Sequence, residues 1–375
     1  MEITEEDILR ERYHEDRVTD RYREWRDAEG IPVHHDLYYD DRDAVETGEW
    51  DRTGQRGAFL NLHGIQGVFD IQLHELVPGG ETTTQHHLYE QIVYVSQGRG
   101  ATEIGTGHDS VVFEWQENSL FFIPQCVPYK HVCYSEDENA HLFAQTTLPE
   151  LYTMLPYEEL VFEPEKNLWE EAADEDFYSV SGDLHHAEGR KDKAVWEANL
   201  VPDLVQFDKL KPRAYRGAGT NIGFKMPNTS IWAHAAEFPR GTYKKAHHRV
   251  GPASVYTILS GEGYSLMWHE DWDQMGKIDW SPGTIISYPH NALHQHFNTG
   301  TEPARYMAWH APTWGATGEM DMYSSSSDMN QIEYHEEDPV VREYYAEQLE
   351  EVGRDLRMPQ ECYTDPEFQF TEPVA

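Results

Sequence analysis

Residues 77–100, VPGGETTTQHHLYEQIVYVSQGRG, and residues 238–263, FPRGTYKKAHHRVGPASVYTILSGEG, carry the same landmarks in the same order. In each stretch a Pro and a Gly precede two adjacent histidines, and a β-rich run that ends at a glycine follows them. Two β-rich runs that follow Pro, Gly and His residues in the same order indicate an internal repeat. The chain therefore contains two copies of one unit.

The repeat continues downstream of both stretches. Ile123-Pro124 precedes His131 in the first copy, and Tyr288-Pro289 precedes His294 and His296 in the second. The interval from His86 to His131 is 45 residues, and the interval from His247 to His296 is 49. Each copy therefore predicts an early and a late histidine block at similar spacing.

Short runs rich in β-formers, separated by Gly, Pro, Asn and Asp, fill both copies and predict strands. Acidic, Trp-containing sequence separates the copies and favours a helical or irregular connection, whereas residues 4–28 predict a single polar helix and residues 340–356 a final helix. We therefore predict an all-β core of two tandem domains with helical terminal extensions. The expected divisions are an N-terminal extension (1–56), a first domain (57–148), a connection (149–216), a second domain (217–312) and a C-terminal tail (313–375).

The charge of the chain restricts its partners. Its 68 acidic and 29 basic residues give a formal net charge of -39, which disfavours nucleic acids and anionic membranes. No apolar run reaches the roughly 18 residues that a membrane span needs, and the charged N-terminus does not resemble a signal peptide. The three cysteines suit a reducing compartment. We expect a cytoplasmic protein, either an ordinary acidic one or a halophilic one whose stability requires salt.

The paired histidines predict a metal site. Imidazole binds Fe, Zn, Cu, Ni and Mn, and a site forms where two or three such groups converge. Residues i and i+2 share a strand face, so His294 and His296 point together. Two adjacent histidines cannot both point inward from a regular strand, so either a bulge turns both or one of them is a ligand. The candidate metal residues are His86, His87, Gln91, His131, His247, His248, His294 and His296.

Gly283, Pro289, His294 and Asn298 stand at the positions of the second conserved motif of the cupin superfamily, with Asn291 in place of a glycine. The duplication resembles a bicupin. This resemblance implies two tandem jelly-roll β-barrels, each of which usually binds one metal through two His, one Glu and a late His.

The chain departs from that ligand pattern. Gln91 and Ser254 stand at the Glu position, Tyr129 replaces the late His of the first copy, and Arg249 replaces the second early His of the second copy. A three-His set without a carboxylate resembles the gentisate and salicylate ring-cleaving dioxygenases. That resemblance implies Fe(II), O₂ and a small aromatic or carboxylate substrate, with Mn, Zn or Ni as other possible metals.

Two other functions stay open. One is a decarboxylase or isomerase that uses Mn or Zn as a Lewis acid, and the other is a non-catalytic small-molecule-binding bicupin, in either case a homo-oligomer. We expect the first copy to hold the metal, because the Arg249 cation would repel a metal in the second. Lys244, Lys245 and Arg249 either steer an anionic substrate or pair with nearby acids. Glu90 is the weakest ligand candidate, and His74, His234 and His310 are expected to be structural.

Overall fold

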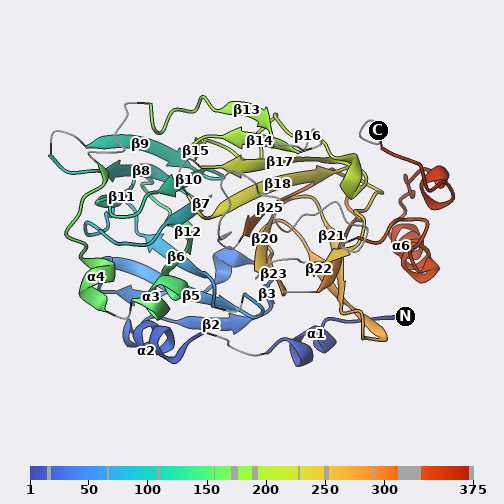
Figure 1. Cartoon of the computed structure of the whole chain (residues 1–375), viewed down its shortest axis with the longest axis horizontal. Coiled ribbons are helices and arrows are strands. Elements are labelled where there is room, and N and C mark those ends of the chain that lie inside the picture. Colours follow the sequence, from blue (N-terminus) through green and yellow to red (C-terminus); the bar gives the residue numbers. More distant parts are fainter. Residues whose placement is uncertain are drawn as a thin grey trace.

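The computed structural model describes residues 1–14, 18–65, 67–107, 110–155, 157–169, 176–187, 193–226, 229–248, 253–289, 292–310 and 331–370. Two β-barrels lie beside each other along the long axis of the molecule (Figure 1).

The first barrel consists of two facing sheets. The larger sheet has the strand order β10-β7-β12-β6-β5 and the smaller one β11-β8-β9. The strands are β5 (Gln55–Leu62), β6 (Asp70–Leu76), β7 (Gln91–Gln97), β8 (Arg99–Ile104), β9 (Val111–Gln116), β10 (Leu120–Ile123), β11 (Tyr129–Cys133) and β12 (Ala140–Thr146).

The second barrel repeats this arrangement. Its larger sheet has the order β23-β20-β25-β18-β17 and its smaller sheet β24-β21-β22, with β19 added beside β24. The strands are β17 (Thr220–Lys225), β18 (Trp232–Phe238), β19 (His247–His248), β20 (Ala253–Ser260), β21 (Gly263–Trp268), β22 (Gln274–Trp280), β23 (Ile285–Pro289), β24 (Leu293–Asn298) and β25 (Ala304–His310).

Strand by strand, the two barrels have the same topology, so that β5 through β12 correspond to β17, β18 and β20 through β25. The pairing register even shifts at the same place, between His141 and Leu142 in β12·β7 and between Ile258 and Ser260 in β20·β25. The predicted all-β core of two tandem jelly-roll barrels is confirmed.

A backbone detail marks the late block of the first barrel. Asn118 and Cys126 stand where the cupin motif has glycines, and both adopt a left-handed φ, of 68° and 54°. Gly283, the counterpart of Asn118, has φ 100°. The turns therefore keep a conformation that favours glycine although the side chains have changed.

The N-terminal extension differs from the predicted single helix. It forms two short helices, α1 (Asp7–Arg12) and α2 (Asp20–Ala28), and four strands, β1 (Glu2–Thr4), β2 (Val33–Asp36), β3 (Tyr38–Tyr39) and β4 (Gly48–Trp50). β2 and β4 pair with β5 of the first barrel, whereas β1 and β3 pair with β22 and β23 of the second. Open sheet edges recruit these segments, which a sequence pattern dominated by charge does not reveal.

The connection also contributes strands that the acidic sequence did not predict. After α3 (Leu148–Met154) and α4 (Glu158–Phe162) come β13 (Asp183–His186), β14 (Ala194–Glu197), β15 (Leu200–Val201) and β16 (Lys211–Pro212). β15 extends the larger sheet of the first barrel, and β14 lies parallel to β17 of the second.

One apolar core joins the barrels. It contains Leu73 and Phe143 of the first barrel together with Ile222 and Trp309 of the second. Arg42, in a 3₁₀ turn of the N-terminal extension, is buried there and donates hydrogen bonds to the Tyr94 hydroxyl and to Thr257 Oγ1. The two barrels therefore share one apolar core, and the hydrogen bonds of Arg42 link them.

The C-terminal segment covers the smaller sheet of the second barrel (Figure 1). It contains α6 (Pro339–Glu351), which Asp338 caps by accepting from Val340 N, and a 3₁₀ helix at Gln360–Tyr363. Throughout the described ranges, no helix is long and apolar enough to cross a membrane.

Candidate functional site

Each barrel holds its late histidine in the same polar frame. On β11, Nδ1 of His131 lies 2.7 Å from Thr102 Oγ1, which accepts from Trp115 Nε1 at 3.0 Å. This frame fixes the plane of a buried imidazole by one of its nitrogens.

The second barrel repeats the frame on β24. Nδ1 of His296 lies 2.9 Å from Ser265 Oγ, which accepts from Trp280 Nε1 at 3.1 Å. The Tyr288 hydroxyl joins this group at 2.9 Å from Ser265 Oγ. His131 and His296 are therefore structural counterparts.

Three of the predicted histidines come together in the second barrel. His247 on β19 pairs in register with His294 on β24, and the centroids of their rings lie 4.3 Å apart. The rings of His294 and His296 lie 5.4 Å apart. Nε2 of His296 is buried and has no hydrogen-bond partner in the described part of the chain.

Burial keeps the rings of His247 and His296 neutral. It lowers the pKa of His296 to about 3, with a smaller contribution from the Lys244 cation, and it holds the pKa of His247 well below its usual range, where Arg216 adds to the effect. A neutral imidazole presents a lone pair that can ligate a metal. The three-histidine group therefore has the donor chemistry of a metal site.

The matching region of the first barrel is closed by hydrogen bonds. Tyr129 occupies the position that His294 has in the other barrel, and its hydroxyl lies 3.0 Å from Nε2 of His87. Gln91 donates to the same hydroxyl at 2.6 Å. Nδ1 of His87 lies 2.9 Å from the Tyr89 carbonyl. Both nitrogens of His87 are therefore engaged by protein groups.

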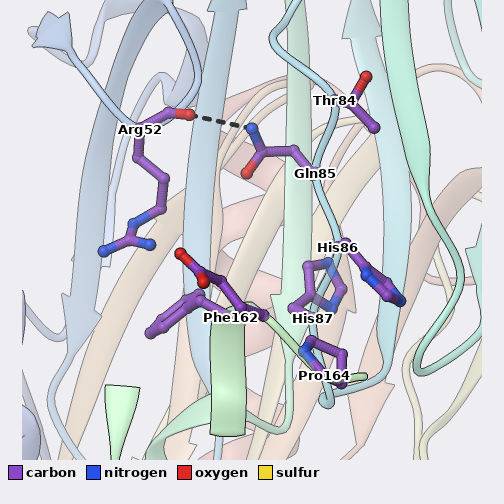
Figure 2. Close-up of a pocket in the computed structure, with 8 residues that line it drawn as sticks. Arg52, Thr84, Gln85, His86, His87, Phe162 and Pro164 are labelled. Atoms are coloured by element: carbon purple, nitrogen blue, oxygen red, sulfur yellow. Dashed lines mark hydrogen bonds between the residues drawn. The ribbon is translucent and has the colours of Figure 1, made fainter. Parts of the chain in front are cut away.

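The remaining candidates lie apart from these groups. His86 lines an open pocket at one end of the first barrel, together with Arg52 and Phe162 (Figure 2). His248 reaches Glu270 with its Nε2 at 3.0 Å. Glu90 accepts from Ser230 N and Oγ at 2.9 Å, so it joins the two barrels and does not act as a ligand there.

Two cations, the buried Lys244 and the half-buried Arg216, lie near the histidines of the second barrel. Lys244 is 4% exposed, and burial together with Arg213 and Arg216 lowers its pKa to about 7. Desolvation lowers the pKa of Arg216 to about 10, and its Nη1 donates to Oε1 of the neutral Gln331 at 3.1 Å. Among the described residues, no carboxylate forms an ion pair with Lys244 or Arg216.

The two other basic residues singled out from the sequence have different outcomes. Lys245 forms an ion pair with Glu333 at 2.5 Å, which agrees with the alternative expectation that these cations pair with nearby acids. Arg249, like Asn291, lies outside the described residues.

The three histidines supply suitable donor atoms for a metal, but their arrangement in this structure does not place those atoms around one ion. In the ranges that the structure describes, no three or more His, Cys, Asp or Glu side chains are arranged so that they could hold a metal ion. His247, His294 and His296 would have to reorient to share one ion, and no carboxylate stands with them.

Several residues of this site were not found from the sequence. Arg216 lies in a connection read only as acidic, and Ser265 and Trp280 carry no motif. The tyrosines that surround the histidine rings, Tyr256, Tyr288 and Tyr306, were not predicted to belong to the site either. Aligning the two copies by strand would have revealed Ser265 and Trp280, because Thr102 and Trp115 occupy the same places. His74, expected to be structural, is buried and stacks on Trp50.

The chain was compared with protein families, with curated proteins and with solved structures, and only the solved structures match. No family model matches the sequence, and no curated protein matches it. Among solved structures, a point mutant of Bacillus subtilis oxalate decarboxylase is similar at a TM-score of 0.48 and 12% identity, covering 74% of this chain and 77% of that one. A structure of the same enzyme from a study of its Mn(II) centres is similar at 0.48 and 13%, with the same coverage. Likenesses this distant carry no argument about activity, metal or substrate.

Proposed function

We propose that the chain is a metal-dependent bicupin enzyme that converts a small anionic substrate in its second barrel. One observation carries this proposal: three adjacent imidazoles lie near two cations, the buried Lys244 and the half-buried Arg216, and no described carboxylate forms an ion pair with either cation. A buried charge is costly unless it is paired. An anionic substrate would supply the missing partner.

His247, His294 and His296 would hold the metal. His296 would present Nε2 to the metal, and the contact between its Nδ1 and Ser265 Oγ would orient the ring, as an orienting partner usually does for a metal-binding histidine. A divalent first-row metal bound by three imidazoles keeps open positions and acts as a Lewis acid or, if it is redox-active, activates O₂. We propose Fe(II), with Mn, Zn or Ni as the alternatives.

The protein residues would bind and orient the substrate. Arg216 offers a planar fork of donors that suits a carboxylate, and Lys244 adds a second positive charge. Tyr256 and Tyr306 lie 5.3 and 5.1 Å from the His296 ring, between centroids, and would exclude water from the reacting atoms. This lining also suits an aromatic ring, as in a hydroxybenzoate.

Two reactions compete for this site. A ring-cleaving dioxygenase and a Mn-dependent decarboxylase would both begin with a carboxylate held next to the metal. Among the described residues no Asp or Glu groups with the three histidines, and a set of three imidazoles would leave an open face for both O₂ and the substrate, so we favour the dioxygenase. We therefore propose the dioxygenase and keep the decarboxylase as the alternative.

Metal analysis followed by activity assays tests the proposal. The native protein should contain about one metal ion per chain and consume O₂ with a hydroxybenzoate; CO₂ release from a small dicarboxylate without O₂ uptake would establish the alternative. His296→Ala should remove the metal, whereas His248→Ala, whose ring pairs with Glu270, should retain it. A folded protein that takes up no metal after anaerobic reconstitution with iron or manganese would refute both enzymes and leave a non-catalytic binding protein.

A further inference from the structure

A pair of histidines lies in the second barrel outside the three-histidine group. His234 on β18 and His310 on β25 were expected from the sequence to be structural, and the structure brings them into direct contact. Nδ1 of His234 lies 2.6 Å from Nε2 of His310, and the two rings are within 14° of parallel. At this distance one nitrogen donates and the other accepts, so one proton lies between them. The pair can therefore carry only one positive charge, because a second would leave two N–H groups facing each other.

Both rings face the interior of the second barrel, where β18 and β25 are neighbouring strands (Figure 1). Alternate residues of a strand point to opposite sides of its sheet. Ala233 and Ala235, the neighbours of His234, belong to the apolar core between the barrels, and so does Trp309, the neighbour of His310. The two histidines therefore point the other way, into the barrel. His310 is 2% exposed, whereas His234 is half-buried and is the more accessible member of the pair.

Tyrosine rings separate this pair from the proposed metal ligands. The ring centroid of Tyr306 lies 5.1 Å from that of His296 and 5.8 Å from that of His234. The corresponding distances from Tyr256 are 5.3 and 6.1 Å. Burial raises the pKa of Tyr306 well above its usual range, so this phenol stays neutral and is not a base. A small aromatic substrate bound beside His296 and packed on these tyrosines would therefore extend towards His234.

The same positions of the first barrel hold a different group. The strand register places Gln72 where the second barrel has His234, and Thr146 where it has His310. Both side chains donate to the buried carboxylate of Asp70. Neither an amide nor a hydroxyl takes up a proton near neutral pH, whereas an imidazole does. The second barrel therefore has, at this place, a group that can accept and return a proton.

A hydroxyl beside the pair lacks a hydrogen-bond partner. Ser254 on β20 is in register with His310 and faces the same interior, because its neighbour Val255 belongs to the core between the barrels. Its side chain is fully buried, and its Oγ has no partner in the described part of the chain. Gln91, its counterpart in the first barrel, donates to Tyr129. A buried hydroxyl needs a partner, which an oxygen atom of a bound substrate would supply.

Charged and titratable groups surround the pair on neighbouring elements. They are Lys193 before β14, Arg213 and Arg216 before β17, Glu90 before β7, and the phenols of Tyr256 and Tyr306. The Trp232 ring stacks on His310 at 3.8 Å between centroids, and the Lys193 ammonium lies 5.8 Å from the centroid of the same tryptophan ring. These cations disfavour a positive charge on the pair before the substrate binds. A substrate that gives its proton to the pair becomes the negative charge that balances it.

We propose that His234 and His310 form an acid–base pair for the reaction of the second barrel, and that a substrate hydroxyl gives its proton to His234 on binding. The O–H bond breaks and leaves its electron pair on the oxygen. A new N–H bond forms at Nε2 of His234, while Nδ1 keeps the proton shared with His310. His310 is a positioning residue that shares the charge, and the Ser254 hydroxyl donates to an oxygen of the same substrate. This inference rests on the function proposed above and adds to it the group that stores the substrate's proton.

Anaerobic calorimetric titration of the metal-loaded full chain with 2-hydroxybenzoate tests the proposal, because runs in two buffers of different ionisation enthalpy count the protons released on binding. Near neutral pH the native protein should release almost none, since the pair keeps the proton. His234→Gln and His310→Leu should bind the same probe and release about one. His310→Gln, which keeps a hydrogen bond to His234, should behave as the native protein does. His269→Gln, at a histidine that pairs with Asp271 beyond the end of β21, is the control.

Two further measurements separate the roles of the residues. Ser254→Ala should weaken the binding of 2-hydroxybenzoate about fivefold, the effect of one hydrogen bond, without changing the proton count. In turnover assays His234→Gln should lower kcat at least ~100-fold. The probe 2-methoxybenzoate, which has no hydroxyl proton, should cause no proton release in any variant.

The possible failures are distinguishable. Equal proton release by the native protein and His234→Gln would overturn the acid–base role while substrate binding stands. If the metal-loaded chain binds neither benzoate, the function proposed for the second barrel is itself wrong, and this inference fails with it. NMR of the ring nitrogens in the metal-free chain should show that His234 and His310 together take up one proton as the pH falls. Uptake of one proton by each ring would mean that no proton is shared, and would overturn the pair.

Discussion

The two barrels share one frame and differ in what fills it. In both, a buried histidine on the equivalent strand is held by a hydroxyl and a tryptophan, His131 by Thr102 and His296 by Ser265. Two residues earlier on that strand, the first barrel has Tyr129 and the second has His294. The Tyr129 hydroxyl forms hydrogen bonds with His87 and Gln91, whereas the His294 ring lies beside the rings of His247 and His296. Tyr129 in place of His294, Gln91 in place of Ser254 and Gln85 in place of His247 therefore separate a hydrogen-bonded interior from a group of potential ligands.

Charge divides the barrels in the same way. Arg52, beside the first barrel's pocket, is paired with two carboxylates, whereas Lys244 and Arg216 face the second barrel's histidines without a carboxylate partner among the described residues. The two copies thus share a scaffold and differ in the charged groups beside it. Our expectation from the sequence that the first copy holds the metal, which rested on Gln91 and on the Arg249 cation, stays an untested prediction, and the proposal made above places the metal in the second copy instead.

Copying the first barrel's residue into the second should have the largest effect. His294→Tyr removes one of three proposed ligands and places a phenol where it can hydrogen-bond to a neighbouring ring. We expect the metal content to fall from about one to near zero and activity to drop at least ~100-fold. Elemental analysis and turnover assays measure both.

The reciprocal change, Tyr129→His, is the matched control. The first barrel should gain no metal from it, because Gln91 and the Tyr89 carbonyl still engage His87. A native metal content in His294→Tyr would place the metal elsewhere in the chain.

The next largest effect concerns the cations of the second barrel. Arg216→Leu should raise KM about 10- to 100-fold and leave the metal content unchanged, because losing a hydrogen bond to a charged group costs about 1.5–3 kcal/mol. Lys225→Met, at a partly exposed lysine that pairs with Glu197, serves as the control. An unchanged KM with a lower kcat would mean that Arg216 does not bind the substrate.

These contrasts show what the sequence can and cannot predict. The paired histidines and their Pro and Gly punctuation predict the two barrels, because they recur as ordered blocks. The convergence of His247, His294 and His296 was predicted in part, because the i, i+2 rule places His294 and His296 on one face. Arg216 was missed, since its approach to the histidines depends on the path of the connection. The strands of the N-terminal extension were missed because they form only against open edges of the barrels.

The described part of the C-terminal segment, residues 331–370, packs against the second barrel, and its buried Glu337 should make the stability of the protein depend on pH. Its carboxylate oxygens accept from Gln295 Nε2 at 2.6 Å and from the Tyr243 hydroxyl at 2.7 Å, and burial raises its pKa from 4.5 to about 7. The folded state therefore binds this proton more tightly than the unfolded state, so stability should fall as the pH rises from about 4.5 to 7 and then level off.

Glu337→Gln should remove this loss and make the protein more stable than the native form at pH 8, by on the order of 1–3 kcal/mol. Urea unfolding between pH 5 and 8 measures the difference. Glu336→Gln, at an exposed neighbour, should retain the native profile. Parallel profiles for the native protein and Glu337→Gln would show that Glu337 is not the group responsible.

The smallest effect should come from removing one hydrogen-bonding group from the interior of the first barrel. Tyr129→Phe removes the hydroxyl that lies 3.0 Å from His87 Nε2 and accepts from Gln91. It leaves these buried polar groups with one partner fewer, so we expect a loss of about 1–2 kcal/mol in the free energy of unfolding. Metal content should not change, because the phenol serves packing and hydrogen bonding and not metal binding. If Tyr129→Phe lowers the metal content per chain, the first barrel contributes to metal binding. The assignment of the ligands to the second barrel would then be wrong.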